Sequence, residues 1–194
     1  MATTATCVAG VDEVGRGPLA GPVVAAAVVL DPSAIPLGLN DSKKLSAKRR
    51  ADILEALRET AQIGIGQATV QEIDDLNILR ASHLAMLRAV AALPVSPDHL
   101  LIDGNMVPRD TDRPATAVVK GDARSVSIAA ASIVAKEHRD AIMRALAQEF
   151  PGYGWERNAG YPTKCHKNAL VDLGLTPHHR RSFKPIHNIL YQVK

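Results

Sequence analysis

The chain has 194 residues, a net charge of +3, and 46% apolar, 22% charged and 3% aromatic residues. This composition excludes a disordered chain, a collagen-like chain and a disulfide scaffold, because it supplies a full apolar core and only two cysteines. No secretory signal is visible, and the longest apolar run, Val23–Leu30, is too short to cross a bilayer. We expect a soluble cytoplasmic monomer without a membrane partner.

The first half of the chain begins with two strands. Apolar and β-branched residues predict strands over Cys7–Val14 and Val23–Leu30, joined as a hairpin by a turn rich in Gly and Pro. Ser46 is a suitable N-cap for the helix that follows. A third strand is predicted over Ile63–Val70, and an apolar stripe at helical spacing predicts one long helix over Gln71–Leu93.

The second half alternates strands with helices. Short apolar runs predict strands over His99–Asp103 and Ala115–Lys120. Asp122 is expected to open a second long helix that reaches about Phe150, and shorter helices are expected over His166–Leu173 and from Pro185. This order predicts an α/β class with a mixed central sheet flanked by helices.

We expect residues 1–194 to form a single domain, in which residues 151–194 are a small basic helical part. That part carries seven Lys and Arg against two Asp and Glu, and four of the seven His. An acidic partner would therefore lie near it, unless the charge is only a solvated surface.

Four acidic residues occupy positions that suit a metal site. Asp12 and Glu13 lie inside an apolar strand, where adjacent side chains face opposite sides of the sheet. Asp103 ends a strand and Asp122 follows one. Each has a structural alternative, such as a turn residue or a helix cap. Together they suit two hard divalent cations held by carboxylate oxygens, since a buried carboxylate is costly unless it is paired or binds metal.

Basic residues and glycines form a second pattern. The glycines at 15, 17 and 21 do not fit a dinucleotide-binding loop, but they would let the backbone and Arg16 approach a phosphate. Cations crowd the start of the helix capped by Ser46, where they oppose the helix dipole. These cations are Lys43, Lys44, Lys48, Arg49 and Arg50. They predict a bound anion such as a nucleic-acid backbone, unless they are merely solvated.

The C-terminal part holds an aromatic residue and a histidine pair. Tyr161 lies in a Gly-Pro turn, where it could stack on a sugar or base, or could be an ordinary residue at the edge of the core. His178 and His179 lack the spacing of a zinc site.

The chain resembles the bacterial ribonuclease HII family, the type 2 ribonucleases H. The string Asp-Glu-Val-Gly-Arg-Gly over residues 12–17 carries much of this resemblance. The matching stretches follow the family's order over nearly the whole chain and are Ala9–Pro22, Leu39–Ser46, Leu100–Asn105, Lys120–Asp122, Ala129–Lys136, Gly160–Thr163 and His179–Phe183. The absence of an N-terminal extension favours this branch over ribonuclease HIII.

The resemblance implies a ribonuclease H-like fold with a short helical C-terminal extension. It implies hydrolysis of the RNA strand of RNA–DNA hybrids and incision 5′ to single ribonucleotides embedded in duplex DNA, as part of ribonucleotide removal. The expected chemistry is two-metal-ion catalysis with Mn²⁺ or Mg²⁺, leaving 3′-OH and 5′-phosphate ends. The rival hypotheses are a junction resolvase of the same fold and a non-catalytic nucleic-acid-binding protein.

The resemblance also implies roles for particular residues. The catalytic and metal-binding acids are Asp12, Glu13, Asp103 and Asp122, with Asp140 as a rival for the fourth position. The 2′-hydroxyl would be sensed by Gly15, Arg16 and Gly17, and the neighbouring sugar would pack on Tyr161. The expected phosphate contacts are Lys43, Lys44, Arg180 and Arg181. No sliding-clamp motif is visible, since Ile189–Lys194 lacks paired aromatics.

Overall fold

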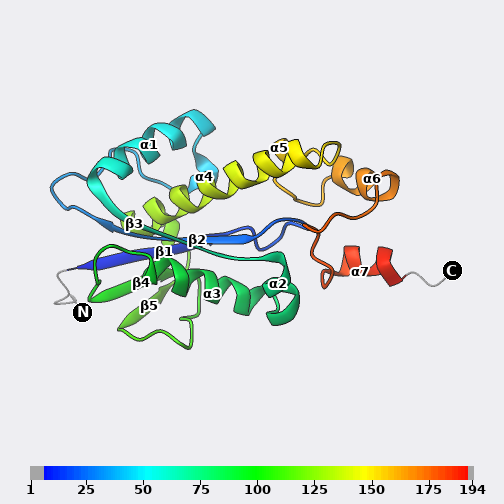
Figure 1. Ribbon diagram of the computed structural model, residues 1–194. Helices are drawn as coiled ribbons and strands as arrows, with labels where there is room; N and C mark the ends of the chain where they lie inside the picture. The colour runs from blue at the N-terminus through cyan, green and yellow to red at the C-terminus, as the bar shows by residue number, and fades with distance from the viewer. Residues whose placement is uncertain (1–6, 192–194) are drawn as a thin grey trace.

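The computed structural model describes residues 7–191 and contains a five-stranded mixed sheet with helices on both faces (Figure 1). The strands are β1 (Val8–Val14), β2 (Val23–Leu30), β3 (Ala61–Ala68), β4 (His99–Asp103) and β5 (Ala115–Val118). Their order in the sheet is β3-β2-β1-β4-β5. The pairs β1–β2 and β2–β3 are antiparallel, whereas β1–β4 and β4–β5 are parallel. The predicted α/β class with a mixed sheet is confirmed.

Two pairs of helices cover the sheet. The α-helices are α1 (Ala47–Thr60), α2 (Val70–Leu76), α3 (Ile78–Ala91), α4 (Val126–Glu149), α5 (Trp155–Asn158), α6 (Lys164–Asp172) and α7 (Lys184–Tyr191), and the 3-10 turns are η1 (Ser42–Lys44) and η2 (Gly121–Ala123). Helices α1 and α4 lie on one face of the sheet, and α2 and α3 lie on the other (Figure 1). Among the described residues, no helix is both long and apolar enough to cross a membrane.

Two predicted helices differ from the structure. The helix predicted over Gln71–Leu93 is broken at Asn77, which has a φ of 72° and caps α3 by accepting hydrogen bonds from the N–H groups of Leu79 and Arg80. The prediction that Asp122 opens the second long helix is also wrong. Asp122 lies in the turn η2, and Ser125 caps α4 instead. In both places a local side-chain cap outweighs the continuous apolar pattern.

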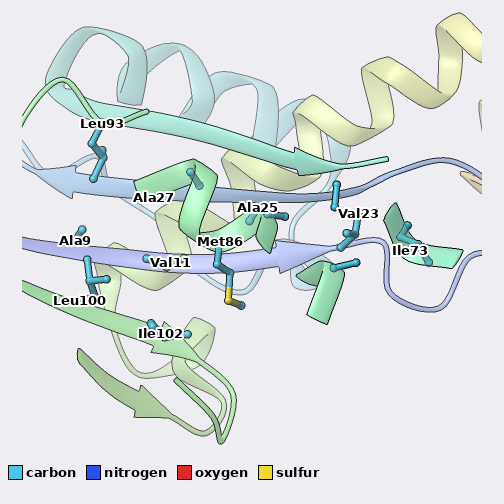
Figure 2. Close-up of a cluster of buried hydrophobic side chains, with 14 residues drawn as sticks. Ala9, Val11, Val23, Ala25, Ala27, Ile73, Met86, Leu93, Leu100 and Ile102 are labelled. Atoms are coloured by element: carbon cyan, nitrogen blue, oxygen red, sulfur yellow. The ribbon is translucent and has the colours of Figure 1, made fainter. Parts of the chain in front are cut away.

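Small residues on the central strands separate two buried clusters. On β2, Ala25 and Ala27 face the α3 side, where they pack with Met86 and Leu93 (Figure 2). Alternate residues such as Ala26 face α4. Because alanines project little from the sheet, both helices can pack close to it.

Gly10 of β1 shows how close this packing is. A Cβ at Gly10 would lie 2.1 Å from the carbonyl carbon of Ser127, in the first turn of α4. We expect Gly10→Ala to destabilise the protein by about 3 kcal/mol or more, because backbone must move to admit the methyl group. Denaturant unfolding measures this. Gly17→Ala is the control, since its Cβ would meet only Tyr161, at 3.5 Å. A loss under about 1 kcal/mol for Gly10→Ala would contradict this packing.

The C-terminal part packs on the loop between β1 and β2. The backbone N–H of Leu19 donates to Gly160 O at 2.8 Å, and that of Gly21 donates to His178 O at 2.9 Å. Ala20 forms an isolated bridge with His179. A third buried cluster joins the same loop to α5, α6 and α7. Segments 141 to 159 residues apart in the chain therefore hold one another in place.

Candidate active site

Asp12 and Asp103 lie side by side at the carboxyl ends of two parallel strands. Val11 of β1 pairs with Ile102 of β4, so the residues that follow them are neighbours. Asp12 is only 7% exposed and accepts a hydrogen bond from the N–H of Glu13 at 2.7 Å. The ends of adjacent parallel strands are a common location for binding sites.

Glu13 lies on the other side of β1, as the alternation of a strand predicts. Its carboxylate pairs with Arg16 at 3.2 Å. It borders a cavity of about 310 Å³ that Asp103 also reaches; the lining residues are Glu13, Arg16, Leu79, Ser82, His83, Met86, Asp103, Gly104, Asn105 and Met106. Glu13 and Asp12 therefore approach the end of β4 from opposite faces of the sheet.

Asp103 brings the fourth acid to the same edge. Its Oδ1 accepts a hydrogen bond from the N–H of Gly121 at 2.7 Å, which draws η2 against the end of β4. Asp122 is the next residue in that turn. The four predicted acids thus gather at one edge of the sheet, although they come from β1, β4 and η2.

The electrostatics of these acids fit a bound cation. Burial raises the pKa of Asp12 well above its ordinary value, and the charges of Glu13 and Asp103 raise it further. Burial also raises the pKa of Glu13, against the opposing effect of Arg16. Within residues 7–191, no Lys, Arg or His forms an ion pair with Asp12 or Asp103. Oxygen ligands that repel one another without a counter-ion suit a hard divalent cation.

The carboxylates do not form a closed cage. In the described part of the chain, no three His, Cys, Asp or Glu side chains converge closely enough to hold a metal ion. What suits this site to a cation is therefore the negative charge and the oxygen atoms of the four acids, which lie along one edge of the sheet.

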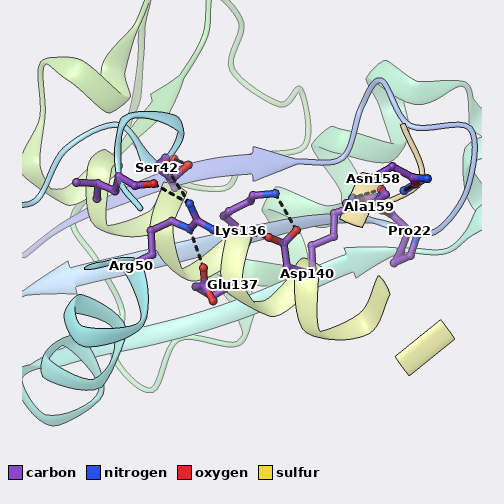
Figure 3. A network of polar contacts seen from close by, with 12 residues as sticks. Pro22, Ser42, Arg50, Lys136, Glu137, Asp140, Asn158 and Ala159 are labelled. Atoms are coloured by element: carbon purple, nitrogen blue, oxygen red, sulfur yellow. Dashed lines mark hydrogen bonds and ion pairs between the residues drawn. The ribbon is translucent and has the colours of Figure 1, made fainter. Parts of the chain in front are cut away.

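Asp140, the rival for the fourth position, has other partners. Its carboxylate accepts a hydrogen bond from Lys136 Nζ at 2.8 Å and lies 3.9 Å from Arg50 Nη2 (Figure 3). Arg50 also pairs with Glu137 at 2.7 Å, so this member of the predicted basic cluster supports the fold. The structure favours Asp122, whose pKa is raised by burial and then by the charge of Asp103.

The glycine loop and Tyr161 lie together. Gly15 is buried with a φ of +95°, a conformation that favours glycine, whereas Arg16 and Gly17 are exposed. Tyr161 is 42% exposed, and its ring edge would lie 3.5 Å from a Cβ built on Gly17. An exposed loop beside a half-exposed ring can contact a sugar on the surface of a duplex.

The basic residues separate into two groups. Lys43 and Lys44 are exposed on η1, and the charge of Lys43 partly opposes the burial and the acidic neighbours that raise the pKa of Asp122. Arg181 is exposed, and its backbone N–H donates to Asp74 Oδ2 at 2.9 Å. These three residues can reach a phosphate.

Arg180 differs from the prediction. Its side chain is fully buried, and its guanidinium donates to the carbonyl oxygens of Gly15, Arg16, Gly21 and Pro22 at 2.6–3.2 Å. A guanidinium enclosed in this way cannot contact a phosphate, so the expected phosphate contact is wrong for Arg180.

Two residues near the site were missing from the sequence prediction. The charge of Asp41, the residue before η1, helps to raise the pKa of Asp122. It lies in the Leu39–Ser46 stretch, which could have indicated it. His83 borders the cavity beside Glu13, and burial and then the charge of Arg16 lower its pKa. Nothing distinguishes His83 within an otherwise apolar helical pattern.

Known proteins are similar to this chain over most of its length. A family model, Ribonuclease HII, matches residues 9–186 of the chain. Ribonuclease HII of Ruegeria pomeroyi is 71% identical over 185 residues, which are 95% of this chain and 79% of that protein. The chain belongs to the ribonuclease HII family.

Solved structures of related proteins share the fold. The ribonuclease H2 of Pyrococcus horikoshii has a TM-score of 0.78 at 28% identity, covering 95% of this chain and 97% of that one. The RNase HII of Archaeoglobus fulgidus, solved as a complex with PCNA, has a TM-score of 0.75 at 25% identity, covering 92% and 95%. Bst-RNase HIII in complex with Mn²⁺ has a TM-score of 0.74 at 22% identity, covering 95% and 69%, a likeness of fold alone.

Proposed function

We propose that the chain incises duplex DNA 5′ to single embedded ribonucleotides, leaving 3′-OH and 5′-phosphate ends, in addition to cleaving RNA in RNA–DNA hybrids. Membership of the ribonuclease HII family makes it a metal-dependent endonuclease that cleaves RNA in RNA–DNA hybrids. The observation that supports the finer activity is the position of the Gly-Arg-Gly loop. It directly follows β1, the strand that carries Asp12 and Glu13, and its exposed Gly17 lies against Tyr161.

In this proposal the four acids supply carboxylate ligands along their shared edge for divalent cations, Mn²⁺ or Mg²⁺. Burial first, and then repulsion by neighbouring acids, raise the pKa values of Asp12, Glu13 and Asp122, and a bound cation would favour the ionised carboxylates. When bound, such ions supply an activated water and neutralise charge on the scissile phosphate. The carboxylates must be ionised to bind them.

The remaining predicted residues bind the duplex. Gly15, Arg16 and Gly17 would recognise the 2′-hydroxyl, the group that distinguishes ribose from deoxyribose, and Tyr161 would pack on the neighbouring sugar. The phosphates would be contacted by Lys43, Lys44 and Arg181, all of which are exposed.

We also propose that residues 1–194 act as a single catalytic domain, with residues 151–194 as its basic part. The contacts between the β1–β2 loop and residues 160 and 178–180 support this. A monomeric state and a cytoplasmic location stay predictions. So does the missing sliding-clamp motif, since residues 192–194 lie outside the described residues.

Three duplexes of one sequence test the proposal: an RNA–DNA hybrid, DNA with a single ribonucleotide, and all-DNA. We expect Mn²⁺- or Mg²⁺-dependent cutting of the first two and none of the third, because a site built to bind a hydroxyl rejects the sugar that lacks it. End-group analysis of the products should show 3′-OH and 5′-phosphate. Cutting of a plain DNA junction, assayed in parallel, would instead support a resolvase. Binding without cutting in either metal would support a non-catalytic protein.

A further inference from the structure

Arg180 is a buried cation whose hydrogen bonds are made to a single loop. Its Nη2 donates to Gly15 O at 2.6 Å and to Gly21 O at 2.8 Å, and its Nη1 donates to Arg16 O at 3.0 Å. Its Nε also donates to Gly21 O at 2.9 Å. No carboxylate forms an ion pair with it among the described residues. The loop carbonyls therefore surround the guanidinium.

This arrangement determines which way two peptide groups point. In a planar trans peptide the C=O of one residue and the N–H of the next point in opposite directions, and no described peptide bond is cis. Because the carbonyls of Gly15 and Arg16 point inward at Arg180, the N–H groups of Arg16 and Gly17 must point away from it. Both of these residues are exposed. Two donors are thus presented together on the surface beside Tyr161.

Burying the charged side chain of Arg180 costs folding free energy. Burial, and then the charge of Arg139, lower the pKa of Arg180 to about 9. Well-packed apolar residues usually replace buried charges at little cost in stability. Here, however, an apolar side chain would leave the loop carbonyls without donors and would not orient them. The cost of the buried charge is explained if the orientation of the loop matters for function.

We propose that Arg180 is a positioning residue for ribose recognition, which holds the backbone so that the N–H groups of Arg16 and Gly17 face the 2′ oxygen of the substrate. This rests on the proposed role of the Gly-Arg-Gly loop. Arg180 touches no substrate and acts through the two peptide groups. Phe183, whose ring centroid lies 5.0 Å from the guanidinium carbon, supports the side chain from behind.

Arg139 provides a matched control. It is equally buried, and burial lowers its pKa to about 10. Its guanidinium donates to Pro22 O at 2.9 Å, Ala20 O at 3.1 Å and Ala159 O at 2.9 Å. Its side chain also packs against Gly15, where a Cβ would lie 2.2 Å from Arg139 Nε, but it donates no hydrogen bond to the carbonyls of Gly15 and Arg16. The two arginines share burial, bond type and the carbonyl of Pro22, but only Arg180 donates to the carbonyls of Gly15 and Arg16.

The test compares Arg180→Lys with Arg139→Lys, since lysine keeps the charge but cannot reach several carbonyls at once. Each variant is assayed well below its unfolding midpoint on duplexes with a 2′-hydroxyl or a 2′-fluoro at the same site. We expect the ratio of kcat/KM for the 2′-hydroxyl duplex to that for the 2′-fluoro duplex to fall at least tenfold in Arg180→Lys. Because fluorine is a poor acceptor, displacing the two N–H groups should slow cleavage of the 2′-hydroxyl duplex much more than that of the 2′-fluoro duplex. The ratio should stay within about twofold of the wild type in Arg139→Lys.

An unchanged ratio in a folded Arg180→Lys, or an equal fall in both variants, would overturn the inference while leaving the nuclease activity of the wild type intact. Failure of the wild type to cut the 2′-hydroxyl duplex would instead refute the proposed function. If Arg180→Lys does not fold, amide exchange in the metal-free wild type decides. The N–H groups of Arg16 and Gly17 should exchange rapidly and shift more with the ribonucleotide duplex than with all-DNA. Protected amides at both positions would contradict the inference.

Discussion

Asp12→Asn is expected to lower cleavage by at least about a thousandfold and to raise the stability of the metal-free protein. Burial and the charges of Glu13 and Asp103 raise the pKa of the Asp12 carboxyl, so its ionised form costs folding free energy. An ionised acid whose folded pKa is raised destabilises the fold above that pKa. Asn removes the charge and can still accept the hydrogen bond from the N–H of Glu13. Relief of such a strained site typically yields about 1 kcal/mol.

Thermal unfolding with and without Mn²⁺ should separate the two effects. Without metal, Asp12→Asn should melt above the wild type. With metal, the wild type should gain stability and the variant should gain much less, because a ligand stabilises only the state that binds it. Binding of a ribonucleotide-containing duplex should persist in the variant.

Asp140→Asn is the matched control for this prediction. Asp140 is another acid with limited exposure, but Lys136 and Arg50 neutralise its charge. Its variant should lose stability and keep cleavage. Substantial cleavage by Asp12→Asn, or a melting temperature below the wild type in the absence of metal, would contradict the assignment of Asp12 as a metal ligand.

Acid should destabilise the protein through a buried pair of histidines. His166 and His179 are at most 1% exposed, and their Nε2 atoms lie 3.1 Å apart. The N–H of Thr176 donates to His179 Nδ1 at 2.9 Å, and the indole N–H of Trp155 donates to His166 Nε2 at 3.1 Å. His166 Nδ1 lies 3.0 Å from the carbonyl of Tyr161.

These hydrogen-bond partners determine which ring nitrogen of each histidine carries a proton. Since a carbonyl only accepts, His166 carries its proton on Nδ1 and accepts at Nε2. Since Thr176 donates to His179 Nδ1, His179 carries its proton on Nε2 and donates to His166. Both rings are therefore neutral. A second proton on either ring would break a bond in the chain that leads to the backbone of Tyr161.

The pH range follows from the pKa of His179. Burial, and then the neighbouring His166, lower it from 6.5 to about 4. Below pH 6.5 the unfolded chain takes up a proton that the folded chain does not accept until about pH 4. Stability is therefore complete above pH 6.5 and falls as the pH decreases, by about 3 kcal/mol at pH 4. The pKa of His166 is also lowered, chiefly by burial, which acts in the same direction.

Denaturant unfolding between pH 4 and 8 measures this effect. The acids of the active site act in the opposite direction, so the useful quantity is the difference between the wild type and His179→Gln. That difference should favour the wild type at pH 8 and shrink toward pH 4, because glutamine can accept and donate without titrating near neutral pH. His187→Gln, at an exposed position on α7, should show no such trend. Parallel pH profiles for the wild type and His179→Gln would contradict the neutral pair.

Much of the fold could be predicted from local patterns. The apolar runs at Val23–Leu30 and His99–Asp103 match β2 and β4, because a strand buried on both faces needs a continuous apolar sequence. The break at Asn77 could not be predicted from the apolar stripe, which continues through it. The stripe reports which residues are buried, whereas the break depends on the cap that Asn77 forms with α3.

The sequence by itself determined the α/β class and the family, and it predicted which acids form the site, because these follow from short strings and from periodicity. Only the tertiary structure decided how those residues are used. It separated Asp122 from Asp140 through the pairing with Lys136, and it changed Arg180 from an expected phosphate contact into a buried support of the loop at residues 15–22. The physical reason is that charge and residue type are local properties, whereas burial and hydrogen-bond partners come from segments as far apart as Gly15 and Arg180.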